Sequence, residues 1–456
     1  MLTGKYDAVV AGAGVGGLCS AALLARHGYR VLLVERLERL GGRFSTIEQD
    51  GFKTPTGAVM IATRGIFQQI FNEVGARFNI KEGGAGRVWL FGEWHDLPEK
   101  GQIQTLLNLL EKMGADRARI VGRLAQGALT EKVLGAFRRA PPTDRSNLMS
   151  FRDWLRQYTD DERVLQLFHA LTSAISTVND FEYPASHWFT YVSAAGQGGM
   201  RYHGISPNGN IENANALAET VRARGGQVLV NSSIDRIVVR DGIVTGVVVN
   251  VENQQKTEVE TQFFISDLGP KRTVELAGRN NFSPDYLKQV DELRAAPIVA
   301  NLIASDRPLV DSNGGLLIVG AKRIVAGVPM TSYSPALAPP GQHLMVIWGT
   351  PASCLNHIDR EKEARENLDD IRRVFPDFDR HGRLLRQDIR DIDDEFPALR
   401  SWMGYDMPQE SPLPNLFHVG DAVKPYGWEG VAACAKSASI IVDKVRRRFR
   451  PGGPGT

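Results

Sequence analysis

Hydrophobic positions near the start of the chain alternate between strand-length runs and a helical repeat. Asp7–Ala11 is a short, almost entirely apolar run of strand length. Leu18–His27 spaces its leucines and alanines so that they share one helix face, and Gly28 follows as a helix end. Arg30–Val34 is a second buried-strand pattern. This order predicts a βαβ unit, with the helix packed on a sheet.

Three glycines lie between the first predicted strand and its helix. Gly12, Gly14 and Gly17 form the pattern G-x-G-x-x-G. The first glycine permits a tight turn, the second lets a pyrophosphate approach the backbone, and the third lets the helix pack closely. The positive end of the helix dipole points at the same place.

Glu35 ends the second predicted strand, where a carboxylate can accept hydrogen bonds from a ribose diol. A glycine-rich turn in some other α/β protein would not explain this carboxylate. The ordered combination therefore predicts a dinucleotide site. It also disfavours a ribose 2′-phosphate, because two negative charges would repel.

The remaining pattern predicts a mixture of helices and strands. Helical spacing is found in several segments, listed in chain order: 66–82 with Gly75 as a cap, 102–139, a helix that begins at Ser150, 163–178, 211–224, 359–375 and 430–448. Strand patterns are found at 87–97 (a hairpin turning near Gly92), 227–231, 234–239, 244–251, 261–266, 297–306, 315–319, 344–350 and 415–419.

Composition narrows the class of protein. A chain of 456 residues is too long for one typical domain. The formal net charge of +2 implies no broad nucleic-acid surface. Cys19, Cys354 and Cys434 have no C-x-x-C spacing, so we expect no disulfide scaffold, no metal site and a reducing compartment. With no room for a signal peptide and no membrane-length apolar run, we expect a cytoplasmic protein.

Two further motifs carry a resemblance. Gly41-Gly42-Arg43 follows Glu35, and Gly420-Asp421 followed by Gly430-Val431 lies near the end of the chain. With the first fingerprint, these segments resemble the flavoprotein superfamily of amine oxidases and phytoene desaturases, and more closely its phytoene desaturase branch. The resemblance spans nearly the whole chain and implies FAD as the cofactor. It departs from the family at Pro55, where relatives usually carry an acidic residue.

The resemblance implies a set of cofactor-binding residues and a fold. The implied residues are Gly12, Gly14, Val15, Gly17, Glu35, Arg36, Gly42, Arg43, Gly57, Ala58, Val59, Ile234, Gly420, Asp421, Gly430 and Val431. The implied fold is α/β, with a discontinuous Rossmann-like FAD-binding domain (1–65, 205–280 and 400–456) and an α+β substrate-binding domain (66–204 and 281–399). Residues 451–456 are expected to form a disordered tail.

The function implied is an FAD-dependent oxidoreductase. It would transfer a hydride between a C–H bond of an apolar, isoprenoid or polyene substrate and flavin N5. The chain has no second glycine fingerprint for NAD(P)H, so the expected electron acceptor is oxygen or a quinone. Two alternatives stay open, namely a flavin amine oxidase with Trp428 beside the flavin, and a non-enzymatic prenyl-binding escort protein.

Candidate catalytic groups are His203, His187, Trp428 and Glu429, although each type is more often structural. The aromatic stretch from Phe181 to Tyr191 is compatible with a pocket for an apolar ligand or with ordinary core. The basic helical segment 102–139 is compatible with peripheral contact to anionic lipid or with a solvated outer face.

Overall fold

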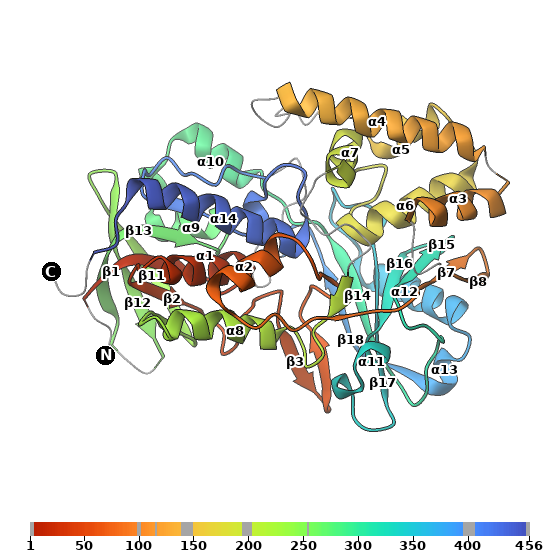
Figure 1. Cartoon of the computed structure of the whole chain (residues 1–456), viewed down its shortest axis with the longest axis horizontal. Helices are drawn as coiled ribbons and strands as arrows, with labels where there is room; N and C mark the ends of the chain where they lie inside the picture. The colour runs from red at the N-terminus through yellow and green to blue at the C-terminus, as the bar shows by residue number, and fades with distance from the viewer. Residues whose placement is uncertain are drawn as a thin grey trace.

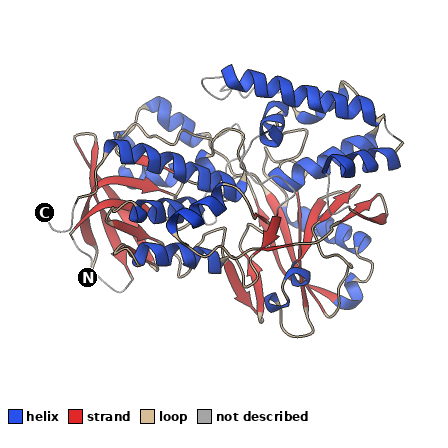
Figure 2. Cartoon of the chain, viewed as in Figure 1, coloured by secondary structure: helices blue, strands red, loops and turns tan. Residues whose placement is uncertain are grey.

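The computed structural model describes residues 4–97, 102–114, 116–137, 149–193, 203–252, 255–394 and 406–452. Two seven-stranded sheets lie side by side, each covered by helices (Figures 1 and 2). The predicted α/β fold class is confirmed. What matters for the site is which segments each sheet brings together.

The first sheet draws its strands from the start, the middle and the end of the chain. Its order is β10 (Gln227–Leu229), β2 (Val31–Val34), β1 (Lys5–Ala11), β13 (Thr257–Ser266), β12 (Ile243–Val251) and β11 (Ser232–Arg240), and β19 (Leu416–His418) also pairs with β13. β10, β2, β1, β13 and β19 run parallel, whereas β11 and β12 form an antiparallel hairpin. The carboxyl ends of the parallel strands therefore share one edge.

Helices from equally distant segments cover this sheet. On one face α1 (Val15–Arg26) lies against α8 (Ile211–Arg222) and α14 (Gly430–Arg448), with α2 (Ile66–Val74) beside them (Figure 1). α9 (Pro270–Ala277) and α10 (Pro284–Asp291) pack in a second hydrophobic cluster, together with buried residues of β11, β12 and β13. The predicted βαβ unit is confirmed as β1, α1 and β2. The helix predicted over 66–82 is shorter, because Gly75 adopts a left-handed conformation (φ 72°) and ends it.

The second sheet is mostly antiparallel. Its order is β18 (Gly382–Arg390), β14 (Ile298–Ser305), β17 (His343–Gly349), β16 (Ile324–Pro329), β15 (Leu316–Val319), β7 (Arg87–Leu90) and β8 (Glu93–Asp96). The hairpin β7–β8 was predicted, but β16 and β18 were not. β18 escapes a hydrophobicity pattern because it carries charged residues that find local partners, such as Arg386 with Asp388 at 3.0 Å.

A helical group stands against one side of the second sheet. It comprises α3 (Gln102–Lys112), α4 (Arg117–Phe137), α5 (Phe151–Arg156), α6 (Glu162–Ser176) and α7 (Ala185–Ser193), while α12 (Arg360–Val374) and α13 (Phe378–His381) pack elsewhere on the sheet (Figure 1). Ser150 caps α5, since its Oγ accepts a hydrogen bond from Asp153 N at 3.0 Å, as predicted.

The segment 102–139 forms two helices, and their apolar residues are used inside the protein. Leu109, Leu110, Met113, Ile120 and Leu124 are buried against α5, α6 and α7. Arg119 and Arg123 are exposed. Peripheral membrane contact through this segment stays a prediction. Across the described ranges, no helix is both long and apolar enough to cross a bilayer.

Smaller elements link the two sheets. They are the hairpin β3 (Thr46–Gln49) and β4 (Phe52–Pro55), the three-stranded sheet β5 (Ile61–Ala62), β9 (His203–Ile205) and β6 (Lys81–Glu82), α11 (Met330–Tyr333) and the 3₁₀ turn η3 (Asp421–Val423). The hairpin β3–β4 turns at Gly51, whose φ is 76°.

Candidate cofactor and catalytic site

The fingerprint turn lies at the carboxyl end of β1. Gly12 has a positive φ of 90°, which glycine adopts without strain. A side chain at Gly17 would collide with the carbonyl oxygen of Gly12, so only glycine lets α1 start this close to the turn. The first turn of α1 receives no side-chain cap from its own N-cap residue, Gly14. The backbone thus presents a helix N-terminus to a ligand.

Glu35 lies at the end of β2, directly beside that turn. Its side chain is buried, and its two carboxylate oxygens accept hydrogen bonds from Ala13 N at 2.7 Å and Leu37 N at 2.8 Å. These bonds hold the carboxylate in a fixed orientation. Arg36, the next residue, is exposed. A carboxylate held in this way still has free lone pairs that can accept hydrogen bonds from ribose hydroxyls.

The two ends of the sequence meet at this edge. Arg43 Nη1 lies 3.1 Å from Asp421 Oδ2. A Cβ on Gly16 would come within 2.7 Å of Gly420 N, so the two glycine segments touch through their backbones. Gly420 N in turn donates to Ser437 Oγ of α14 at 2.9 Å. The convergence of the N-terminal and C-terminal motifs is therefore a property of the fold.

The segment Gly57–Val59 is docked on the same region. Ala58 N donates to Arg43 O at 2.9 Å, and Asn210 Nδ2 donates to Ala58 O at 2.7 Å. Pro55 keeps its place in β4, where its carbonyl accepts from Arg386 Nη2 at 3.1 Å. Strand β11, which contains the buried Ile234, begins beside Glu35. Its Ser232 N donates a hydrogen bond to Glu35 O at 2.9 Å.

Three of the four catalytic candidates lie where α7 packs on the loop before α14. The ring of His187 is fully buried and stands perpendicular to Tyr426, with centroids 4.9 Å apart. Glu429 Oε1 accepts a hydrogen bond from Tyr183 Oη at 3.4 Å. Trp428 lies in the same loop, with Lys436 Nζ 5.8 Å from its ring centroid.

His203 occupies a different element. It is the first residue of β9 and pairs with Ala62 of β5, just beyond the Gly57–Val59 segment. The aromatic stretch 181–191 also contributes residues to two different places. Trp188 stacks on Phe151 with centroids 4.3 Å apart and belongs to the core, whereas Tyr183 faces the loop before α14.

Electrostatics distinguish the groups around Glu429. Burial, with Glu429 nearby, raises the pKa of the Tyr183 phenol well above its usual range, so this hydroxyl stays protonated and donates. Lys424 is fully buried, and its Nζ lies 2.8 Å from Asp406 Oδ1. Burial alone would lower the pKa of Lys424, but the carboxylates of Asp406, Asp421 and Glu429 outweigh it and raise that pKa.

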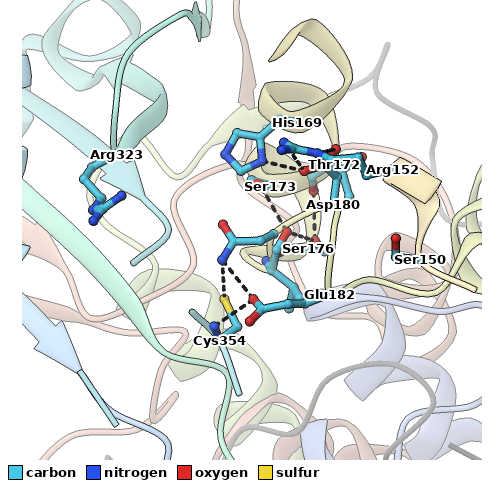
Figure 3. Close-up of polar contacts among 12 residues, drawn as sticks. Ser150, Arg152, His169, Thr172, Ser173, Ser176, Asp180, Glu182, Arg323 and Cys354 are labelled. Carbon is cyan, nitrogen blue, oxygen red and sulfur yellow. Dashed lines mark hydrogen bonds and ion pairs between the residues drawn. The ribbon is translucent and has the colours of Figure 1, made fainter. Parts of the chain in front are cut away.

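The loop that carries Tyr183 is held from both sides (Figure 3). Asp180 is fully buried and accepts two hydrogen bonds from Arg152, at 2.9 and 2.7 Å, and lies 2.7 Å from His169 Nδ1. Glu182 accepts from Cys354 N at 2.8 Å and Ser353 Oγ at 2.7 Å. These contacts hold the residues on the N-terminal side of Tyr183 in place.

Three residues of this region were not singled out from the sequence. Lys424, Tyr183 and Asp267 take part through contacts with segments far away in the chain. Asp267 directly follows β13, and the predicted strand 261–266 pointed to its position but not to a role. Within the described part of the chain, no group of three or more His, Cys, Asp or Glu side chains is arranged to hold a metal ion.

Taken together, the parallel sheet, the glycine turn and the held carboxylate are those of a dinucleotide-binding fold. Residues 15–445 match the family model described as flavin containing amine oxidoreductase, and the chain belongs to this family. It is an FAD-dependent oxidoreductase, and FAD is its cofactor. The non-enzymatic escort reading is thereby set aside.

Sequence relatives extend over most of the chain. It is 24% identical to prolycopene isomerase 2 of an Oncidium hybrid cultivar, over 97% of this chain and 84% of that protein. It is 38% identical to phytoene desaturase of Fusarium fujikuroi, but only over 16% of this chain and 12% of that protein. The second match is thus local.

Solved structures show the same fold. An oxidoreductase from Methanosarcina mazei superimposes with a TM-score of 0.80 at 24% identity, covering 96% of this chain and 100% of that one. A putrescine oxidase superimposes with a TM-score of 0.71 at 14% identity, covering 97% and 99%. The amine oxidase superfamily, predicted from the glycine motifs, is confirmed.

Proposed function

We propose that this enzyme transfers a hydride between a C–H bond of an apolar substrate, of isoprenoid or polyene type, and N5 of FAD. Bound FAD supplies the hydride acceptor, while the chain supplies position, charge and exclusion of water. The observation that carries the proposal is the junction of α7 with the loop before α14. There, Tyr183 donates a hydrogen bond to the Glu429 carboxylate, and the His187 ring packs between the rings of Tyr183 and Tyr426.

The cofactor contacts follow from the geometry at the sheet edge. We assign the ribose diol to Glu35, with Arg36 and the Ile234 strand near the adenosine end. The diphosphate is assigned to the N-terminus of α1 and to Arg43, whose guanidinium neutralises charge. Asp421 is assigned to the ribityl hydroxyls, and Gly57–Val59 with Gly430-Val431 to the ring. The glycine contacts that would exclude a side chain fit such a ligand.

The domain boundaries belong to the same proposal. The three segments 1–65, 205–280 and 400–456 would form the FAD-binding domain, and 66–204 with 281–399 the substrate-binding domain. Support comes from the two sheets, whose strands fall on these segments.

Glu429 is the group that we assign to proton removal. Desaturation takes a hydride from one carbon and a proton from its neighbour, so a base is needed beside the hydride acceptor. Glu429 precedes Gly430, where α14 begins, and Tyr183 donates to its carboxylate. The buried ammonium of Lys424 attracts Glu429 together with Asp406 and Asp421, so it helps to hold this group of carboxylates in place. His187 and His203 are kept as positioning candidates.

The names of the relatives support an apolar substrate. A prolycopene isomerase is similar over nearly the whole chain, and phytoene desaturases are similar locally. The second candidate function is amine oxidation, because a putrescine oxidase has the same fold. Lys436 near Trp428 does not favour that tryptophan as a steering ring for an amine, because a cation already lies over it.

Anaerobic mixing of the purified holoprotein with graded substrates tests the proposal. We expect polyenes such as phytoene to bleach the oxidised flavin absorbance, and primary amines to leave it unchanged. Reoxidation by air or by a quinone then identifies the electron acceptor. Bleaching by amines with no response to polyenes would replace this function by the second candidate.

A further inference from the structure

Asp267 lies at the place where the two glycine motifs meet. It follows β13, and its backbone N donates to Ala11 O of β1 at 2.8 Å. Side chains added at Gly14 or Gly420 would collide with its carboxylate, and a Cβ on Gly16 would come within 2.8 Å of it. Glycines from both ends of the chain therefore surround this one carboxyl group.

The carboxylate occupies the N-terminus of α1. Asp267 Oδ2 accepts a hydrogen bond from Gly17 N at 3.0 Å, which is a bond that an N-cap side chain normally makes. Gly14, the N-cap residue itself, has no side chain to supply. Asp267 thus caps α1 from another strand, at the helix end assigned to the diphosphate.

Charged and titratable groups face Asp267 from every neighbouring element. Glu35 and Asp421 repel its charge, and Arg43 attracts it. Cys19 of α1 and Cys434 of α14 present buried thiols whose pKa values are raised, in part by Asp267. Burial, reinforced by Glu35 and Asp421, outweighs Gly17 N and Arg43 and raises the pKa of Asp267 to about 8.

Two anions cannot share this helix end at low cost. The negative charges of Glu35 and Asp421 already disfavour the ionised form of Asp267. A bound diphosphate would add further negative charge and disfavour that form still more. A neutral carboxylic acid can keep its carbonyl oxygen on Gly17 N and offers an O–H donor to an anion.

We propose that FAD binds with the carboxyl group of Asp267 in its neutral form, so that binding is coupled to uptake of one proton at alkaline pH, where the FAD-free protein has lost that proton. The inference rests on the cofactor contacts proposed above. The step is balanced, since one proton moves from solvent to the carboxylate while the diphosphate replaces its charge at α1. Because cofactor binding favours the protonated form, affinity is highest at low pH and falls where the FAD-free protein loses this proton.

Release of FAD from full-length holoprotein, followed by flavin fluorescence between pH 6 and 9.5 at constant ionic strength, tests this coupling. We expect an affinity that is constant below about pH 7.5 and then falls by up to about tenfold per pH unit. Asp267→Asn mimics the neutral acid and removes this fall. Asp241→Asn, at an exposed turn between β11 and β12, is the matched control and keeps the wild-type profile.

Calorimetry in buffers of different ionisation enthalpy gives a second readout on full-length protein stripped of FAD. Wild type takes up close to one proton per FAD at pH 9 and far less at pH 6.5, whereas Asp267→Asn takes up none. If Asp267→Asn does not fold, Asp267→Ala serves the same comparison. Equal pH profiles for wild type and variant overturn the proton coupling and leave the site standing, whereas failure of the wild type to bind FAD at any pH overturns the site itself.

Discussion

The edge of the parallel sheet and the junction at α7 build their sites in opposite ways. At the sheet edge, backbones touch one another, and glycines at 16, 17 and 420 leave no room for a Cβ. At the junction, the contacts are between side chains, such as the hydrogen bond from Tyr183 to Glu429. A site made of backbone tolerates almost no substitution, whereas a site made of side chains can change its chemistry and keep its fold.

The sharpest test of this contrast is Gly17→Ala. The new methyl group would collide with the Gly12 carbonyl, and backbone cannot move aside as a side chain can. We expect loss of about 3 kcal/mol or more of stability, together with loss of bound flavin. The ratio of flavin to protein absorbance and a thermal melt measure both effects.

Gly122→Ala is the matched control, because a Cβ there meets nothing within 4 Å and the residue lies in helix α4. It should retain flavin and melt at or slightly above the wild-type temperature. A yellow, stable Gly17→Ala protein would remove the backbone argument for the fingerprint turn.

Glu429→Gln tests the side-chain site. The amide keeps the shape and can still accept from Tyr183, but it cannot take a proton. We expect flavin to stay bound while substrate-driven flavin reduction slows by about 100-fold. Stopped-flow absorbance under anaerobic conditions measures the rate.

Tyr183→Phe provides the graded comparison, since it removes one hydrogen bond and leaves the carboxylate in place. Its effect should be much smaller than that of Glu429→Gln. Equal rates for Glu429→Gln and wild type would exclude Glu429 as the base.

Asp180→Asn tests the support behind Tyr183. The buried carboxylate holds Arg152 and His169, and its loss should destabilise the protein by about 2 kcal/mol at neutral pH. Burial would raise the pKa of Asp180, but hydrogen bonds and charge from His169 and Arg152 outweigh it and lower that pKa. Such a group stabilises above its unfolded-state pKa and loses its contribution as pH falls through the folded value.

The difference between wild type and Asp180→Asn should therefore shrink as the pH falls below about 4. Urea unfolding at pH 7 and at acidic pH measures it. Asp153→Asn, in the exposed first turn of α5, is a milder comparison. A constant difference across this pH range would contradict the ionic role of Asp180.

The smallest expected effect is that of His203→Ala. His203 lies on β9 at the link between the two sheets, where it pairs with Ala62, and not among the other three candidates at α7 and the loop before α14. We expect full flavin content and a reduction rate lowered by about tenfold or less, as expected for loss of a positioning group. Unchanged reduction kinetics would remove His203 from the site.

The sequence was informative where function depends on glycine. G-x-G-x-x-G, Gly41-Gly42 and Gly420 mark positions that backbone geometry demands, so their spacing predicted a dinucleotide site and carried the resemblance that implied FAD. The strand and helix periods around them were equally local properties, and β1, α1, β2 and α14 follow them closely. The range 66–82 was too long for the helix, although its predicted cap Gly75 is the residue at which the structure ends it.

Tertiary structure alone decided which side chains meet. Asp267 faces Gly17 across 250 positions, and Tyr183 reaches Glu429 across 246, so no local pattern could pair them. Strand β18 carries charges that look solvated in the sequence, and only its pairing with β14 shows that it belongs to the sheet. The charge of buried Lys424 looks solvated too, but its ammonium lies 2.8 Å from Asp406, 18 positions away. Local spacing encodes backbone shape, but the energy of a buried charge depends on neighbours that only the folded chain supplies.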